Sequence, residues 1–275
     1  MAWSMLAAGG VCASAQDGDN APILTFHTTL YDLAADQNSF TIGLGATQET
    51  QLGVDTGYGI EYYTVGQAVF DPESQAIVST RIPCSVGEAG EVKVYGDPSL
   101  IDYIDLEGCY ITSLSFPELT EVEILNLKHN LIEDLDLTHM DRLQAIYLTD
   151  NPFDEGQLTV GGPKPELTIL EMSIINHLNP AFNMSDYPAL VSFEAWSCPT
   201  LTSVNPAGCP ELMRLSIDVT QVSSVDVTHN PKLLILNVSD TSVTSLDVSQ
   251  NPYLTELYCG HAGASSHNYR MTSLD

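Results

Sequence analysis

The sequence predicts a solenoid of stacked β-coils, preceded by a small β-sandwich-like domain. Two consecutive segments between Leu212 and Tyr253, LMRLSIDVTQVSSVDVTHNPK and LLILNVSDTSVTSLDVSQNPY, have equal length and align without a gap. Apolar residues occupy the same six positions in both segments. The N-terminal part instead carries short strand signals without a helical period. A spacing that recurs residue for residue indicates stacked coils rather than a globule.

The apolar positions fit L-x-x-L-x-L-x-x-N/C/T-x-L, which is the pattern of a leucine-rich repeat. We number the slots of each repeat from its first apolar residue. The repeats are 21 to 24 residues long and start at Ile101, Val122, Leu143, Leu167, Leu190, Leu212, Leu233 and Leu254. We therefore expect residues 99–275 to form about eight coils, with the last one incomplete.

Each coil should open with a short strand whose fourth and sixth residues point inward and whose third, fifth and seventh point outward. The stacked strands would make a parallel β concave face. The second half of each coil alternates again, so we expect an extended, turn-rich convex side rather than helices. The third repeat is stretched at residues 151–156, and the fourth and fifth carry small insertions that should bulge outward. Inward slots around these insertions are Leu158, Val160, Phe182, Met184 and Val204.

The N-terminal part, residues 16–98, has short β-branched and aromatic runs separated by turn residues. These runs are residues 23–26, 40–44, 51–54, 61–65, 76–78 and 91–95. They predict a small β-sandwich over about residues 21–92. Residues 55–59, Asp-Thr-Gly-Tyr-Gly, are its candidate tight hairpin, with glycine supplying the positive φ.

The first residues predict an export signal. Residues 1–11 are small and apolar, and Ala13-Ser14-Ala15 fits an A-x-A cleavage site. We expect residues 1–15 to be a signal peptide for Sec-type export, and the mature protein to be secreted or at the cell surface. No later stretch is long and apolar enough to span a bilayer.

The chain is strongly acidic. It has 36 acidic and 8 basic side chains, a formal net charge of −28. This charge repels phosphate backbones and anionic lipids, so nucleic acid and membrane surfaces are disfavoured as partners. The five cysteines after the predicted cleavage site show no C-x-x-C spacing. We expect buried thiols in the core, with a Cys198–Cys209 bridge as the alternative.

One stretch carries a family resemblance. Residues 246–259, LDVSQNPYLTELYC, closely resemble the LDVSxNPxLTxLxC unit of bacterial surface leucine-rich-repeat proteins of the internalin-like and BspA-like type. Residues 91–97 also resemble the strand that leads into the first repeat of those proteins. The resemblance covers about residues 91–275. It implies a non-enzymatic, adhesin-like recognition module exported to the cell surface.

A ligand would contact the outward slots of the concave face. The third slots are Tyr103, Ile124, Ala145, Ile169, Ser192, Arg214, Ile235 and Glu256. The fifth slots are Asp105, Asn126, Tyr147, Glu171, Glu194, Ser216, Asn237 and Tyr258, and the seventh slots are Glu107, Lys128, Thr149, Ser173, Trp196, Asp218, Ser239 and Gly260. Large aromatic residues are common anchors of binding surfaces. The candidate ligand-binding residues are Tyr147, Glu171, Glu194, Trp196, Arg214 and Tyr258. They suit a host or bacterial surface protein of basic character, or a glycan that stacks on the rings.

No catalytic constellation is evident. The seven histidines are scattered over different repeats, and no metal-binding, nucleophile or phosphate-loop motif occurs. We therefore predict no enzyme activity, no cofactor and no metal. Aspartates at 136, 226 and 247, with asparagines at 183 and 205 in register, leave a structural calcium role open. Two other functions remain as alternatives, a structural spacer at the cell surface and an enzyme activity in the N-terminal domain.

Overall fold

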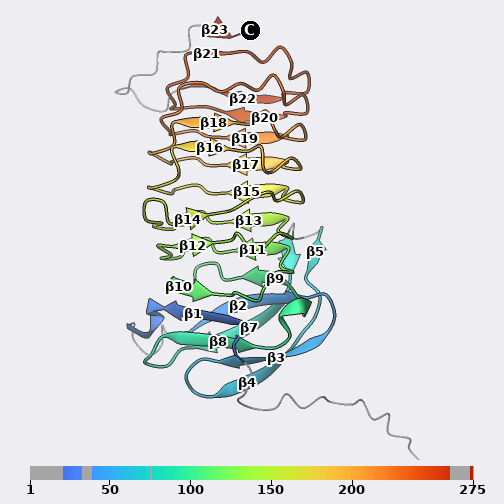
Figure 1. The fold of residues 1–275 in the computed structure, drawn as a ribbon, viewed down its shortest axis with the longest axis vertical. Helices are drawn as coiled ribbons and strands as arrows, with labels where there is room; N and C mark the ends of the chain where they lie inside the picture. Colours follow the sequence, from blue (N-terminus) through green and yellow to red (C-terminus); the bar gives the residue numbers. More distant parts are fainter. Residues whose placement is uncertain (1–20, 33–38, 73, 75, 261–272, 275) are drawn as a thin grey trace, which may run out of the picture.

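The computed structural model describes residues 21–32, 39–72, 74, 76–260 and 273–274. These residues form an elongated stack of β-coils on an N-terminal block of antiparallel strands (Figure 1). Over the described ranges the only helical elements are two 3₁₀ turns, η1 (Thr29–Asp32) and η2 (Pro98–Leu100). The predicted signal peptide, residues 1–15, lies outside the described residues.

The N-terminal block contains eight strands. They are β1 (Leu24–Thr28), β2 (Ser39–Ala46), β3 (Thr50–Asp55), β4 (Ile60–Val65), β5 (Val69–Asp71), β6 (Ala76–Val78), β7 (Thr80–Ser85) and β8 (Glu91–Tyr95). All six predicted strands are present, whereas β5 and β7 were not predicted. One sheet contains β1, β8, β3 and β4, and β2 and β7 belong to another. Buried apolar residues such as Phe26, Ile42 and Leu52 form the core of the block.

The predicted hairpin joins β3 to β4. The two strands pair antiparallel from Thr50–Val65 to Asp55–Ile60. Gly57 and Gly59 both have positive φ, at 98° and 107°. The Asp55 carboxylate accepts hydrogen bonds from both of their N–H groups, at 2.9 and 3.2 Å. The turn is therefore closed by one aspartate and by the backbone freedom of glycine.

The coils contribute eight parallel strands to one sheet. They are β9 (Ile101–Asp105), β11 (Ile124–Asn126), β13 (Ala145–Tyr147), β15 (Ile169–Glu171), β17 (Ser192–Glu194), β19 (Arg214–Ser216), β20 (Ile235–Asn237) and β22 (Glu256–Tyr258). Each strand pairs with the next without a register shift, so the predicted third and fifth slots align across all eight coils. The predicted tiling and the parallel face are confirmed.

The convex side also carries short extended segments. They are β10 (Ile111–Ser115), β12 (Leu135–Asp136), β14 (Leu158–Thr159), β16 (Ala181–Asn183), β18 (Ser203–Asn205), β21 (Ser245–Leu246) and β23 (Ser273–Leu274). They pair only locally, β12 with β14, β16 with β18 and β21 with β23. The prediction of extended rather than helical convex segments is confirmed.

The N-terminal block and the coils share both of their large sheets. β2 pairs antiparallel with β9, so the parallel sheet of the coils continues through β2 into β7. On the convex side β10 pairs antiparallel with β1. The apolar N-terminal end of the solenoid is therefore covered by the block, and the edge of its first strand is paired.

The core between the two sides is a continuous stack of apolar residues. The fourth and sixth slots of the first seven coils are almost fully buried, for example Leu125, Leu127, Phe193 and Ala195. Ninth-slot residues cap the turns between coils. Asn130 donates to the carbonyls of Leu106 and Leu127 at 2.9 Å. The ninth slot is the N/C/T position of the repeat pattern.

The cysteines of the described residues are free thiols, and most of them lie in the core. Cys84, Cys109, Cys198 and Cys209 are buried and unbridged, and Cys259 is half-buried and also free. Burial raises the thiol pKa of Cys198 and of Cys209 to about 11. The alternative of a Cys198–Cys209 bridge is wrong, because the two thiols face different carbonyls, that of Met172 and those of Met184 and Tyr187.

Candidate functional site

The candidate residues lie on the concave face, which we define by the third, fifth and seventh slots of the eight coils. The strand register places Tyr147, Glu171 and Glu194 side by side on three neighbouring strands. Arg214 follows on the next strand, opposite Ser192. Trp196 is two residues beyond Glu194, so it projects from the same face.

Lys128, Tyr147 and Glu171 form one contact group across three coils. The ammonium group of Lys128 lies 5.0 Å from the centre of the Tyr147 ring and 3.5 Å from the carboxylate of Glu171. Both charged side chains are about three-quarters buried. Burial raises the pKa of the Glu171 carboxyl, and Lys128 opposes that rise. Burial and the neighbouring Glu171 also raise the pKa of Tyr147. The ring is therefore held between two charged neighbours.

Glu194 and Arg214 form a second pair. Nε of Arg214 donates to a carboxylate oxygen of Glu194 at 2.5 Å. Trp196 next to this pair is half-buried, and its backbone N–H donates to the hydroxyl of Ser173 at 3.2 Å. Tyr147, Glu171, Glu194, Trp196 and Arg214 thus occupy four consecutive coils.

Tyr258 does not join this group. Ser216 and Asn237 separate its fifth-slot position from Glu194. The Tyr258 hydroxyl donates to the Glu256 carboxylate at 2.8 Å, and this bond raises the pKa of the phenol. The ring is about half exposed, at 49%. It is a separate aromatic contact point near the end of the described coils.

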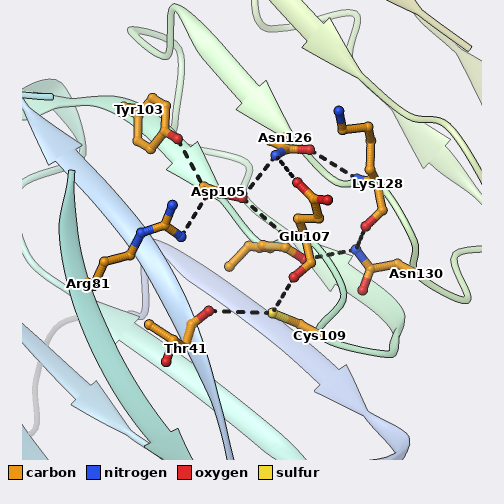
Figure 2. Close-up of polar contacts among 10 residues, drawn as sticks. Thr41, Arg81, Tyr103, Asp105, Glu107, Cys109, Asn126, Lys128 and Asn130 are labelled. Carbon is orange, nitrogen blue, oxygen red and sulfur yellow. Dashed lines mark hydrogen bonds and ion pairs between the residues drawn. The ribbon is translucent and has the colours of Figure 1, made fainter. Parts of the chain in front are cut away.

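A polar network marks the other end of the concave face (Figure 2). The Asp105 carboxylate meets Arg81 of β7 at 2.8 Å and accepts from the side-chain amide of Asn126 at 3.0 Å. The same amide donates to the Glu107 carboxylate at 2.9 Å. Figure 2 shows the side chains of Arg81 and Asn126 converging on Asp105. The network fixes the junction between the N-terminal block and the first two coils.

Two residues that make these contacts, Lys128 and Arg81, were not among the candidate residues predicted from the sequence. Lys128 was placed on the seventh-slot ladder but not among the candidate residues, because its fifth-slot partner two coils away emerges only once the strands are stacked. Arg81 lies in β7, which carries no recognisable strand signal. An isolated basic residue in so acidic a chain is the one cue that could have pointed to either.

Two of the histidines in the described part of the chain contact polar groups of other coils. A ring nitrogen of His129 lies 2.9 Å from the carboxylate of Asp150, and a ring nitrogen of His139 lies 3.1 Å from the carbonyl of Phe116. Across the described residues, no three His, Cys, Asp or Glu side chains gather in a way that could hold a metal ion. Asp136, Asp226 and Asp247 instead each accept the backbone N–H two residues ahead.

The comparisons with solved structures agree with this architecture. A leucine-rich-repeat protein from Leptospira interrogans superposes with a TM-score of 0.52 at 18% identity, over 59% of this chain and 44% of that one. The fold is a leucine-rich-repeat solenoid.

Two further similar structures come from Listeria monocytogenes. The functional domain of InlJ, described as including a cysteine ladder, has a TM-score of 0.47 at 22% identity, over 60% of this chain and 40% of that one. Internalin C2 has a TM-score of 0.35 at 15% identity, over 57% of this chain and 82% of that one. The chain therefore spans less than half the length of the Leptospira protein and of the InlJ domain. No protein-family model matches the sequence, and neither does any curated protein.

The described part of the chain has no helix with the length and apolar character that a membrane crossing requires.

Proposed function

We propose that the protein is a non-enzymatic extracellular recognition module that binds a protein or a glycan on the concave face of its repeats. The observation that carries this proposal is the group of Tyr147, Glu171, Glu194, Trp196 and Arg214 on consecutive coils, in which ion pairs hold the two glutamates. Export to the cell surface belongs to the same proposal and is supported by the A-x-A site at residues 13–15.

Preorganisation favours binding by this surface. Lys128 and Arg214 each hold a neighbouring carboxylate, and Lys128 also lies over the Tyr147 ring, so these side chains have little rotamer freedom left to lose. Ordering a flexible side chain on binding costs about 0.5–1.5 kcal/mol, and a surface that is already ordered avoids that cost. Rigid aromatic rings also provide large contact areas.

The charge of the concave face suits a partner of basic character. The three ladders carry two basic side chains, Lys128 and Arg214, and six carboxylates. The carboxylates are Asp105, Glu107, Glu171, Glu194, Asp218 and Glu256. Lys128 pairs with Glu171, Arg214 with Glu194, and Arg81 of β7 with Asp105. The carboxylates of Glu107, Asp218 and Glu256 remain as an excess of negative charge on the face. A glycan would instead use the rings of Tyr147 and Trp196 for stacking.

The fold also supports a binding module over an enzyme. The concave face is an open sheet, and two of its carboxylates, Glu171 and Glu194, are engaged in ion pairs with Lys128 and Arg214. Long parallel arrays of this kind offer extended surfaces that suit recognition of a macromolecule. No observation on the described residues favours an activity in the N-terminal block.

The test is a screen of the intact chain on arrays of host proteins, bacterial surface proteins and glycans. We expect at least one partner whose binding falls about tenfold or more in Trp196→Ala, in line with the cost of removing a buried aromatic anchor. The matched control is Tyr253→Ala, which removes an aromatic ring that is 64% exposed and lies off the concave face. Equal binding by Trp196→Ala and wild type to every partner would refute the proposal and leave the structural spacer.

A further inference from the structure

The convex side is interrupted between the third and fourth coils. β12 pairs with β14 and β16 pairs with β18, but β14 and β16 belong to different sheets. On the concave side the same two coils stay paired through β13 and β15. The two coils are therefore paired on the concave side and separated at β14 and β16, as Figure 1 shows. They meet again beyond these strands, where the Lys164 N–H donates to the carbonyl of Asp186 at 2.9 Å.

The sequence explains the opening. The third and fourth repeats, which start at Leu143 and Leu167, are the two longest, at 24 and 23 residues. Their extra residues lie outside the concave strands, so they lengthen only the convex half of each coil. The parallel register of the concave strands is kept, and the additional chain displaces the convex segments.

Buried side chains on the convex side show the same displacement. They lie three residues before the start of the next repeat and bond to the coil before. In the later coils Asn230 and Asn251 each donate to two carbonyls of the coil before, at 2.8–3.0 Å. In the fourth coil the equivalent residue is Tyr187, whose hydroxyl reaches the carbonyl of Gly161 in the third coil at 2.9 Å. A tyrosine spans a wider gap than an asparagine, which fits the greater separation of these two coils.

The opening is a cavity of about 700 Å³ between β14 and β16. Its lining includes the buried side chains of Met172, Leu178 and Tyr187 and the half-buried ring of Phe182. Phe182 is stacked on Tyr187, with ring centres 6.1 Å apart. This volume lies within the range of ligand sites, about 300–1,000 Å³. The inward slots Leu158 and Phe182, predicted to be in the core, are only half-buried because they border this cavity.

Both walls of the cavity are strand edges. Leu135 and Leu137 of the second coil donate to the carbonyls of Gln157 and Thr159. Because the backbone groups of a parallel strand alternate in direction, the N–H and C=O groups of Leu158 and Val160 face the fourth coil.

The opposite wall follows from the same rule. The carbonyl of Pro180 accepts from the fifth coil, and Met184 donates to Asn205 of that coil. The backbone groups of Ala181 and Asn183 therefore face the third coil. No strand pairing joins the two walls among the described residues. The Ala181 N–H already donates to the side-chain oxygen of Asn179 at 3.1 Å. The other backbone groups of the two walls form the rows of donors and acceptors that an added strand would use.

We propose that this cavity binds an extended peptide segment, which enters as an additional strand between β14 and β16 and places apolar side chains on the floor of Met172, Phe182 and Tyr187. A peptide satisfies both walls at once, whereas a compact apolar ligand would leave the backbone groups without partners. Glu155 lines the rim, and the chain carries a net charge of −28, so a peptide with a basic residue at that end is favoured. This site is separate from the concave face.

The test uses the intact chain and a library of random peptides of roughly six residues, about twice the length of β16. We expect enriched sequences that combine apolar and basic residues. Their binding should fall at least tenfold in Leu158→Trp, which fills the cavity, and stay unchanged in Trp196→Ala. A library that enriches no peptide, equal binding by Leu158→Trp, or loss of binding in Trp196→Ala would each overturn the proposal.

A second measurement needs no protein variant, so it remains valid if Leu158→Trp does not fold. The central amides of an enriched peptide are N-methylated one at a time. Each methyl group removes one backbone donor, and we expect each to weaken binding to the wild-type chain about tenfold, the effect of one lost hydrogen bond. Methylated peptides that bind within about twofold of the parent would show that only the side chains are recognised, and would contradict strand insertion.

Discussion

Arg81 of β7 and Asp105 of β9 form an ion pair of 2.8 Å across the junction between the N-terminal block and the first coil. The two sides of this pair differ in exposure, because the Asp105 side chain is 7% exposed and the Arg81 side chain is 53% exposed. The carboxylate is therefore the buried member. Its partners are Arg81, Asn126, the N–H of Glu107 and, at 3.4 Å, the hydroxyl of Tyr103 (Figure 2). The first coil is thus attached to the block by charge as well as by strand pairing.

Removing the arginine should destabilise the chain. We expect Arg81→Met to lower the free energy of unfolding by about 1–3 kcal/mol, because a buried carboxylate loses the one cationic partner that it has among the described residues. The measurement is urea unfolding followed by circular dichroism. The control is Arg142→Met, since Arg142 meets Glu121, Glu123 and Glu166 at 3.4–3.8 Å on the surface. That change should cost less than about 1 kcal/mol. Equal effects of the two variants would contradict the importance of the junction pair.

The eighth slot of every complete coil adopts the left-handed conformation. Its residues are Gly108, His129, Asp150, Ile174, Ser197, Val219 and Asp240, with φ between 54° and 66°. Two of them, Ile174 and Val219, are β-branched, which makes this conformation costly. The turn is imposed by the coil, whose eighth-slot N–H donates to the seventh-slot carbonyl of the next coil, as Val219 does to Ser239.

Relieving that strain should stabilise the solenoid. Val219 is 48% exposed, so Val219→Asn changes little packing and should add about 1 kcal/mol to the free energy of unfolding. The reverse change is Gly108→Val, where an added Cβ meets no atom within 4 Å. It should cost about the same amount through backbone strain alone. We expect the melting temperature to rise in Val219→Asn and to fall in Gly108→Val. Changes of the same sign in both variants, or no change in either, would contradict this explanation.

The convex aspartates should make the fold sensitive to acid. Hydrogen bonds from Thr228 lower the pKa of Asp226 below its usual value, and Asp136 and Asp247 behave in the same way. A carboxyl whose pKa is lowered on folding stabilises the fold above its unfolded pKa and loses that effect as the pH falls through the folded value. Wild type should therefore lose more stability than Asp226→Asn when the pH is lowered from about 5 to about 3.

The asparagine variant retains the side-chain oxygen that caps the turn, as Asn183 and Asn205 do in other coils. Thermal melts of both proteins across this pH range provide the measurement. Parallel curves for the two proteins would show that Asp226 does not contribute to the acid sensitivity.

The convex asparagines illustrate how far the sequence alone could be interpreted. The Asn-Pro pair at Asn230 and Pro231 predicts a turn, and the chain does turn there. The sequence does not reveal that Asn230 is fully buried and bonds to the carbonyls of Pro206 and Cys209. Lys164 occupies the equivalent position in the third coil, is also buried, and donates to the carbonyls of Leu137 and Met140. No repeat pattern predicts a lysine there, because its partners belong to the coil before.

Those buried donors should matter for stability. Asn230→Ala removes two hydrogen bonds to carbonyls in the core and should lower the free energy of unfolding by about 2–4 kcal/mol. Gln250→Ala, an exposed amide in the next coil, should change it by less than about 0.5 kcal/mol. Urea unfolding compares the two variants, and a similar small effect of both would mean that these buried donors do not contribute.

The periodicity of the repeats was sufficient to predict the concave face, because a strict slot pattern fixes both register and side-chain direction. The same reasoning could not predict which outward residues touch. Lys128 and Glu171 are two coils apart, and their contact over Tyr147 depends on side-chain length and burial. The cavity at Leu158 and Phe182 was also beyond it, because insertions are visible in a sequence but the separation that they cause is not.

The most direct test of the concave-face account is site-specific photocrosslinking to a partner recovered from the arrays. A photoreactive benzoylphenylalanine replaces Tyr147 on the concave face in one protein and Tyr253 off that face in another. We predict a covalent adduct with the partner from position 147 and none from position 253. An adduct from position 253 alone, or equal adducts from both positions, would contradict binding on the concave face.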